Sequence, residues 1–241
     1  MFVSDVAYDS FMGRYSMRLA PLFADFAGIE AGQRVLDVGA GTGALTGELV
    51  RRGARTAAAE PSSAFVAALL RRFPEADVRE AGAESLPWPD ESFDAALAQL
   101  VLAFMSDARA GLAEMHRVTR AGGTVAACMW DVERMEMLAA INATRRALGD
   151  AGNRRPFMQR DEIESLFGAQ AELLSVEAEY ADFDEFWNAL LGGAGPAGAW
   201  AVSLDDDQRT AAQRDLRRNL GEPDGPFTLV GRAWAVRITR A

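Results

Sequence analysis

Five apolar runs of strand length alternate with helix-forming segments in the first part of the chain. The alternation of strands with amphipathic helices is typical of βαβ units, which fold into a parallel sheet covered by helices. In the segment after the first run, for example, Leu45, Leu49 and Val50 fall on one helical face. The sequence therefore predicts an α/β fold with strands at 34–38, 55–59, 77–81, 93–98 and 124–129 and helices at 44–52, 63–73 and 109–119.

Beyond Trp130 this alternation stops. The chain of 241 residues suits one α/β domain with added helices better than two equal domains, so we expect a single domain. Its parts are an N-terminal lid (1–30), a core (31–130), cap helices with a sixth strand (131–226) and a last strand (227–241). Within the later parts we predict helices at 133–148, 160–167, 182–191 and 205–220, strands at 172–180 and 227–239, and a glycine-rich loop at 192–198.

The composition excludes several kinds of chemistry. The chain has one cysteine and one histidine, and all 25 of its Lys and Arg residues are arginine. Disulfides within the chain, multi-histidine metal sites and lysine Schiff bases are therefore excluded, and we expect no metal. His116 lies in a helix away from the strand ends, where packing is the favoured role. The difficult chemistry must then come from a cofactor.

Net charge and hydropathy limit the classes of molecule that this protein is expected to bind. The formal net charge of −10 repels a phosphate backbone, so nucleic acid is disfavoured as a partner. We see neither a signal peptide at the start nor an apolar stretch of membrane-spanning length. We therefore expect a cytoplasmic protein with a small-molecule partner and no membrane, and the oligomeric state stays open.

A glycine-rich loop, 39–43, joins the first predicted strand to a helix. Such a loop lets the backbone approach a ligand closely and aims the helix N-terminus at it. The spacing Gly39-x-Gly41-x-x-Ala44, with Glu60 further along, also fits the fingerprint of dinucleotide-binding proteins. A nicotinamide-dependent oxidoreductase is therefore the alternative function.

Charge separates the two cofactors. A dinucleotide places an anionic pyrophosphate over the loop, and Asp37 stands two residues before Gly39. S-Adenosylmethionine instead carries an ammonium and a sulfonium, which a carboxylate attracts. Asp37 thus favours S-adenosylmethionine.

Several segments in order resemble class I S-adenosylmethionine-dependent methyltransferases of the type 11 kind. Residues 35–43 resemble motif I of that family, and Glu60-Pro61 resembles its ribose-binding strand end. Residues 82–88 with 92–94 resemble its adenine segment, and 117–123 resemble its turn before the fifth strand. The resemblance covers 35–130, and more weakly 8–15. It implies a Rossmann-like, mostly parallel seven-stranded sheet whose last strand is antiparallel, and a product, S-adenosylhomocysteine.

The resemblance also implies roles for the donor-binding residues. Gly39, Ala40 and Gly41 form the loop, and Asp37 fixes the ammonium end of the cofactor. Glu60, followed by Pro61, accepts the ribose hydroxyls.

Further residues complete the predicted cofactor site. Glu84 or the backbone at Ala83 reads the adenine edge, and Gln99 faces the methionine moiety at the end of the fourth strand. In the N-terminal segment, Arg14 pairs with the methionine carboxylate and Tyr8 or Tyr15 closes over it. No catalytic residue is identified, because the sulfonium is already activated; a cofactor-binding module without catalysis is a third alternative.

Overall fold

The computed structural model of the protein describes residues 5–150 and 156–241. The chain divides into two compact units, which we describe separately. The larger unit comprises 16–130, 156–174 and 233–241, and the smaller unit comprises 1–15, 131–155 and 175–232. The expectation of one domain with a lid and a cap stays a prediction.

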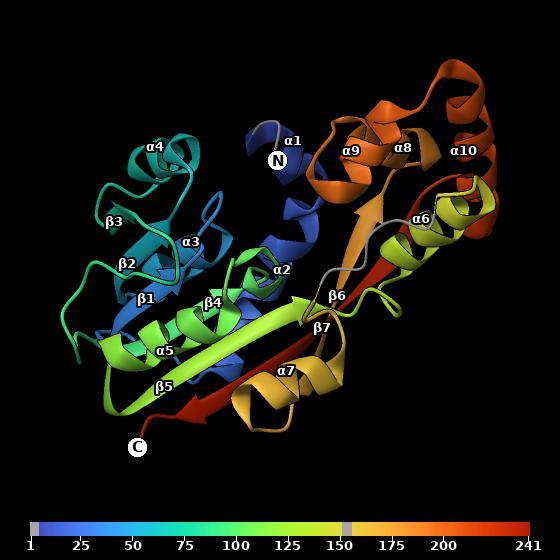
Figure 1. The fold of residues 1–241 in the computed structure, drawn as a ribbon. Coiled ribbons are helices and arrows are strands. Elements are labelled where there is room, and N and C mark those ends of the chain that lie inside the picture. The colour runs from blue at the N-terminus through green and yellow to red at the C-terminus, as the bar shows by residue number, and fades with distance from the viewer. Residues whose placement is uncertain (1–4, 151–155) are drawn as a thin grey trace. The chain divides into compact units, whose positions relative to one another are not determined.

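The strands form one sheet of seven, in the order β3-β2-β1-β4-β5-β7-β6. β1 pairs in parallel with β2 and β4, β2 with β3, and β4 with β5, whereas β7 runs antiparallel to β5 (Figure 1). The predicted fold class is therefore confirmed. The strands are β1 (Arg34–Val38), β2 (Arg55–Glu60), β3 (Asp77–Glu80), β4 (Phe93–Gln99), β5 (Thr119–Trp130), β6 (Glu172–Tyr180) and β7 (Phe227–Thr239).

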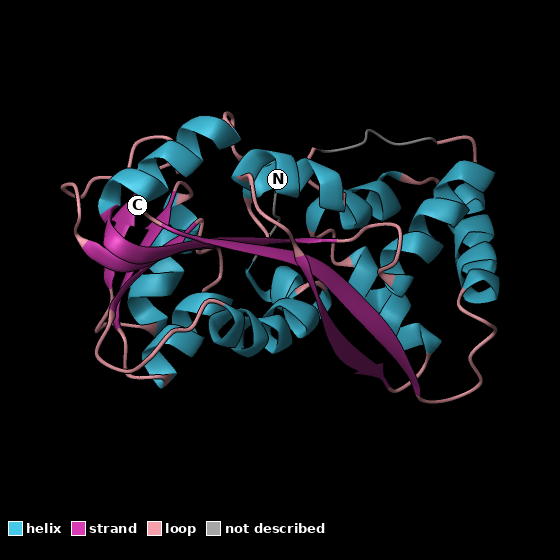
Figure 2. Cartoon of the chain, turned by 90° about the horizontal axis from the view of Figure 1, so that it is seen from below, coloured by secondary structure: helices cyan, strands magenta, loops and turns pink. Residues whose placement is uncertain are grey.

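Helices lie on both sides of the strands in the larger unit (Figure 2). None of the helices in the described ranges combines the length and apolar character needed to cross a bilayer. The larger unit holds most of α2 (Gly13–Phe26), together with α3 (Ala44–Arg51), α4 (Ser63–Arg72), the 3₁₀ turn η1 (Leu102–Phe104), α5 (Ala108–Val118) and α7 (Arg160–Phe167). The smaller unit holds α1 (Asp5–Phe11), α6 (Glu136–Ala147), α8 (Phe183–Leu191), α9 (Gly195–Ser203) and α10 (Asp206–Asn219).

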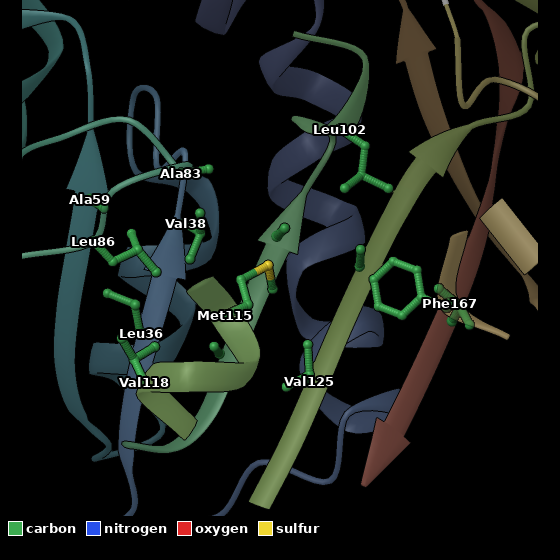
Figure 3. Close-up of a cluster of buried hydrophobic side chains, with 14 of the residues drawn as sticks. Leu36, Val38, Ala59, Ala83, Leu86, Leu102, Met115, Val118, Val125 and Phe167 are labelled. Atoms are coloured by element: carbon green, nitrogen blue, oxygen red, sulfur yellow. The ribbon is translucent and has the colours of Figure 1, made fainter. Parts of the chain in front are cut away.

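Alternate residues of the parallel strands build the main core of the larger unit. On β1, Leu36 and Val38 enter this core, while Asp37 between them hydrogen-bonds to α3. Met115 of α5 and Phe167 of α7 pack on the same face as Leu36 and Val38 (Figure 3). The two-residue period thus assigns one sheet face to α5 and α7.

The start of the fifth strand differs most from its prediction. The predicted helix 109–119 and strand 124–129 leave a turn between them, but α5 ends at Val118 and β5 already begins at Thr119. The pairing with β4 jumps from Thr119 to Thr124, so residues 120–123 form an irregularity inside the strand. The glycines there allow a close approach, since a Cβ on Gly123 would lie 2.6 Å from the Asp94 carbonyl oxygen.

The predicted glycine-rich loop 192–198 is partly helical, because α9 begins at Gly195. A Cβ on Gly198 would lie 2.5 Å from the carbonyl carbon of Gly193. Glycine is therefore needed here so that α9 can pack backbone to backbone against the preceding turn.

Candidate functional site

The glycine loop lies at the carboxyl end of β1, where ligands bind in open α/β sheets. The backbone N–H groups of Gly39 and Ala40 both donate to the Ala59 carbonyl, at 2.8 and 3.1 Å, which anchors the loop to the end of β2. A Cβ on Gly39 would overlap the side chain of Val101, which follows β4. The first glycine is therefore required by packing between β1 and the turn after β4.

The other two loop glycines differ in what surrounds them. Both have positive φ, 56° at Gly41 and 94° at Gly43. A Cβ on Gly43 would lie 2.5 Å from the Phe73 ring and 2.8 Å from Leu69, so this residue packs α3 against α4. Nothing lies within 4 Å of a Cβ on Gly41. Gly41 is thus the loop position at which a ligand can approach the backbone.

Glu60 ends β2 beside this loop and is 6% exposed. Its Oε2 accepts a hydrogen bond from the Gly41 N–H at 2.9 Å, and its Oε1 accepts one from the Ser62 N–H at 3.0 Å. Burial raises the pKa of the Glu60 carboxyl, although these two hydrogen bonds oppose the increase. The carboxylate predicted to hold the ribose therefore also holds the shape of the loop. Pro61, the next residue, is exposed.

Asp37 is 1% exposed and lies behind the loop. The Thr46 hydroxyl on α3 donates to Asp37 Oδ2 at 2.6 Å. Burial raises the pKa of Asp37 to about 7, and the negative charge of Glu60 adds to this increase. Two buried carboxylates thus act on each other at neighbouring strand ends, and their donors are a hydroxyl and backbone N–H groups.

The end of β4 adds a polar group and an unusual backbone conformation. Gln99 donates from Nε2 to the Ser16 carbonyl at 3.1 Å, while its buried Oε1 has no hydrogen-bond partner among the described residues. Leu100 follows with φ +64°, a left-handed conformation rare for leucine, and its N–H donates to the Cys128 carbonyl. This turn directs the chain so that Val101 covers Gly39.

Glu84 and Ala83 lie in the loop after β3. Ala83 is buried in the main core, whereas Glu84 Oε1 accepts hydrogen bonds from Ser106 and Asp107 in the turn before α5. The Glu84 carboxylate is therefore engaged within the protein. The predicted contact of either residue with adenine stays a prediction.

Tyr8, Arg14 and Tyr15 belong to the smaller unit, whereas the other predicted site residues belong to the larger one. Arg14 forms an ion pair with Glu185 and donates to the Glu179 carbonyl at 2.7 Å, and its guanidinium lies 4.7 Å from the centre of the Tyr180 ring. Tyr8 is half-buried on α1. Arg14 thus joins α2, α8 and β6 within the smaller unit, and its predicted role toward a cofactor stays a prediction.

The motifs in the sequence do not predict three residues that lie at this site: Thr46, Leu100 and Val101. Thr46 lies nine residues beyond Asp37 and had no motif to mark it, although a polar residue in the buried face of a predicted helix is a usable signal. Leu100 and Val101 read as ordinary apolar residues. His116 lies half-buried on α5, where burial lowers its pKa.

Comparison with known proteins bears on this site directly. Residues 36–127 match a family model described as a methyltransferase domain. This part of the chain is similar to methyltransferase domains. The demethylmenaquinone methyltransferase of Beutenbergia cavernae is 41% identical over 99 residues, which cover 41% of this chain and 41% of that protein. The chain thus spans less than half the length of that relative, and the family resemblance is confirmed for residues 36–127.

Solved structures share the fold of this protein over most of the chain. A candidate type II methyltransferase from Anaeromyxobacter dehalogenans superposes with a TM-score of 0.68 at 21% identity, covering 92% of this chain and 95% of that one. The [4+2]-cyclase SpnF superposes with a TM-score of 0.54 at 25% identity, covering 90% and 80%. The fold is therefore shared with a protein that is named for a different reaction.

Proposed function

We propose that this protein transfers a methyl group from S-adenosylmethionine to a small-molecule acceptor. The observation that carries the proposal is the pair of buried carboxylates, Asp37 and Glu60, around a glycine loop with free space at Gly41. Buried carboxylates favour a cationic ligand, because a cation offsets the cost of burying their charge. A ligand with an ammonium and a sulfonium meets this requirement.

The remaining donor and acceptor groups fit the same ligand. Each carboxylate oxygen of Glu60 accepts one backbone N–H and keeps a further lone pair, which suits two neighbouring ribose hydroxyls. The buried Oε1 of Gln99 is an acceptor in need of a donor, and an ammonium group provides one. These groups lie at the ends of β2 and β4, on either side of the β1 loop.

S-Adenosylmethionine supplies a methyl group that is already activated on sulfur. The work left to the protein is to hold the two reactants in line and to keep water away. In our proposal Asp37, Glu60 and Gln99 orient the donor. Val101 and the exposed ring of Phe104 give the turn after β4 an apolar character suited to excluding water. The proposal assigns no general base.

The acceptor proposed first for assay is a demethylated quinone in its reduced, quinol form, because an electron-rich ring that can lose a proton is needed to attack the methyl group. The matched relative from Beutenbergia cavernae is named a demethylmenaquinone methyltransferase. Because the match spans 41% of that relative, the panel of acceptors must include other phenols and amines.

Two other functions are tested alongside this one. The loop spacing also fits a nicotinamide cofactor, but the Gly41 N–H that would face a pyrophosphate donates to Glu60 instead. The likeness to SpnF favours a second candidate, a reaction other than methyl transfer on the same fold.

Calorimetry with S-adenosylhomocysteine and with NAD tests the ligand. We expect S-adenosylhomocysteine to bind and NAD not to bind. The reverse result would contradict the proposal. Glu60→Gln should weaken binding about 10- to 100-fold, because a hydrogen bond to a charged group contributes about 1.5–3 kcal/mol. The matched control is Glu75→Gln, since Glu75 is an exposed carboxylate in a turn.

Transfer of a labelled methyl group to the acceptor panel then tests the reaction. We expect labelled product with at least one acceptor. Binding of the nucleoside without any transfer would favour the non-catalytic alternative or another reaction.

A further inference from the structure

We propose that Glu84 is a positioning residue, which ties the loop after β3 to the turn after β4 and does not itself contact the ligand. The inference rests on the proposed function, because it concerns the same site. It replaces a direct reading of the adenine edge by the Glu84 carboxylate.

One oxygen of Glu84 accepts three hydrogen bonds within the protein. Oε1 accepts from the Ser106 N–H at 2.7 Å, the Ser106 hydroxyl at 2.8 Å and the Asp107 N–H at 3.1 Å. Oε2 folds back over the loop, 3.0 Å from where a Cβ on Gly82 would lie. Burial alone would raise the pKa of Glu84, but the hydrogen bonds from Asp107 and Ser106 hold it below its ordinary value. The carboxylate is thus a charged acceptor for three donors of a single turn.

That turn joins the end of β4 to the start of α5. Asp107 caps α5 by accepting from the N–H groups of Arg109 and Ala110. Next to it, Met105 and Ala83 both pack against Gly111 of α5, where a Cβ would lie 2.8 Å from the Met105 sulfur and 3.3 Å from the Ala83 Cβ. The beginning of the β3 loop and the β4 turn therefore pack against the same position of α5, Gly111. Glu84 links these two segments by hydrogen bonds.

The later part of the loop is held by other residues. Glu114 accepts from the Leu86 N–H at 2.8 Å, and Arg117 donates to the Leu86 and Trp88 carbonyls at 2.9 and 2.8 Å. These contacts fasten the loop to α5 without involving the β4 turn. Glu84 therefore couples the β3 side of the site to the turn that carries Val101 and Phe104.

Calorimetry with two nucleosides separates positioning from direct reading. S-Adenosylhomocysteine carries the adenine amine, and S-inosylhomocysteine has an oxygen in its place. We expect Glu84→Ala to weaken both ligands by the same factor, about 10- to 100-fold, so that the ratio of their dissociation constants stays at the wild-type value. Glu84→Gln should recover most of the affinity, because its amide oxygen accepts from the same turn.

The controls distinguish the failure modes. Glu75→Ala removes an exposed carboxylate and should leave both affinities unchanged. Ser106→Ala removes one of the three donors, so it should weaken both ligands less than Glu84→Ala does, again at a constant ratio; it also serves if Glu84→Ala does not fold. A ratio that falls to one in Glu84→Ala would show that Glu84 reads the amine, and unchanged affinities would show that it positions nothing. Absence of binding to the wild-type protein would contradict the proposed function instead.

Discussion

At the residue scale, Asp37 gives the ligand-free protein a distinctive pH dependence. Its pKa rises from 3.8 to about 7 on folding, because the carboxyl is buried beside Glu60. Since the folded value is the higher one, protonated Asp37 stabilises the fold fully below about pH 4. This contribution of up to roughly 4 kcal/mol is lost as the pH rises through about 7.

The side chain that Asp37→Asn introduces cannot ionise. We therefore predict that the free energy of unfolding of this variant increases relative to that of the wild type as the pH rises from 4 to 8. Urea unfolding of both proteins at the two pH values measures this gain, and titrations common to both proteins cancel. The exposed carboxylate of Asp224 provides the control, Asp224→Asn. An unchanged difference between Asp37→Asn and wild type would show that Asp37 is already ionised at pH 4.

The same residue couples ligand binding to a proton, if the proposed function holds. The ammonium group of S-adenosylhomocysteine favours the ionised form of Asp37, so we predict that binding of this ligand strengthens from pH 6 to pH 8 and releases a proton. Calorimetry in two buffers of different ionisation enthalpy measures that proton. Asp37→Asn should bind more weakly and without this pH dependence; an equal dependence in both proteins would assign it to another group.

At the element scale, the loop between β1 and α3 separates a packing glycine from a binding glycine. Gly43→Ala should lower the free energy of unfolding more than Gly41→Ala does, because its methyl group would overlap the side chains of Phe73 and Leu69. Gly41→Ala should cost only about 1–2 kcal/mol of backbone strain, since the space is open, yet should lose ligand affinity.

The matched control for both variants is Gly122→Ala. Gly122 also has positive φ and open space around a Cβ, but it lies near the start of β5, far along the strand from its carboxyl end. In urea unfolding, all three variants should lose free energy of unfolding through backbone strain, and Gly43→Ala should lose more because its packing is disturbed. In calorimetry, Gly41→Ala should bind S-adenosylhomocysteine more weakly. Equal affinities of Gly41→Ala and Gly122→Ala would remove the binding role from Gly41.

At the scale of the whole molecule, the larger unit contains the domain match and the proposed site. We predict that S-adenosylhomocysteine at about 100 times its dissociation constant stabilises this unit by about 2.7 kcal/mol. Hydrogen exchange should then slow at 39–43, 60–62, 82–84 and 99–107. Slower exchange confined to other segments would place the ligand elsewhere. Whether hydrogen exchange also slows in the segment with Tyr8 and Arg14 on addition of the ligand tests the predicted lid.

The periodic features of this protein follow from its sequence alone. The bounds of β1, β6, β7 and α7 match their predictions, because apolar periodicity and turn residues act over a few neighbouring positions. The glycine loop with Asp37 and Glu60 was found in the same way, from local spacing. The start of β5 was missed, since the pairing of Thr119 with Phe93 depends on a strand distant in sequence.

Which polar groups of the site meet depends on how the chain packs in three dimensions. Thr46 joins Asp37, Glu60 accepts from the Gly41 N–H, and Glu84 turns toward Ser106. A side chain's hydrogen-bond partner is set by which strands and helices become neighbours, and no local pattern encodes that choice. The charge and glycines of the site were therefore readable from sequence, whereas the roles of its individual carboxylates depend on the packing of β1, β2 and β4.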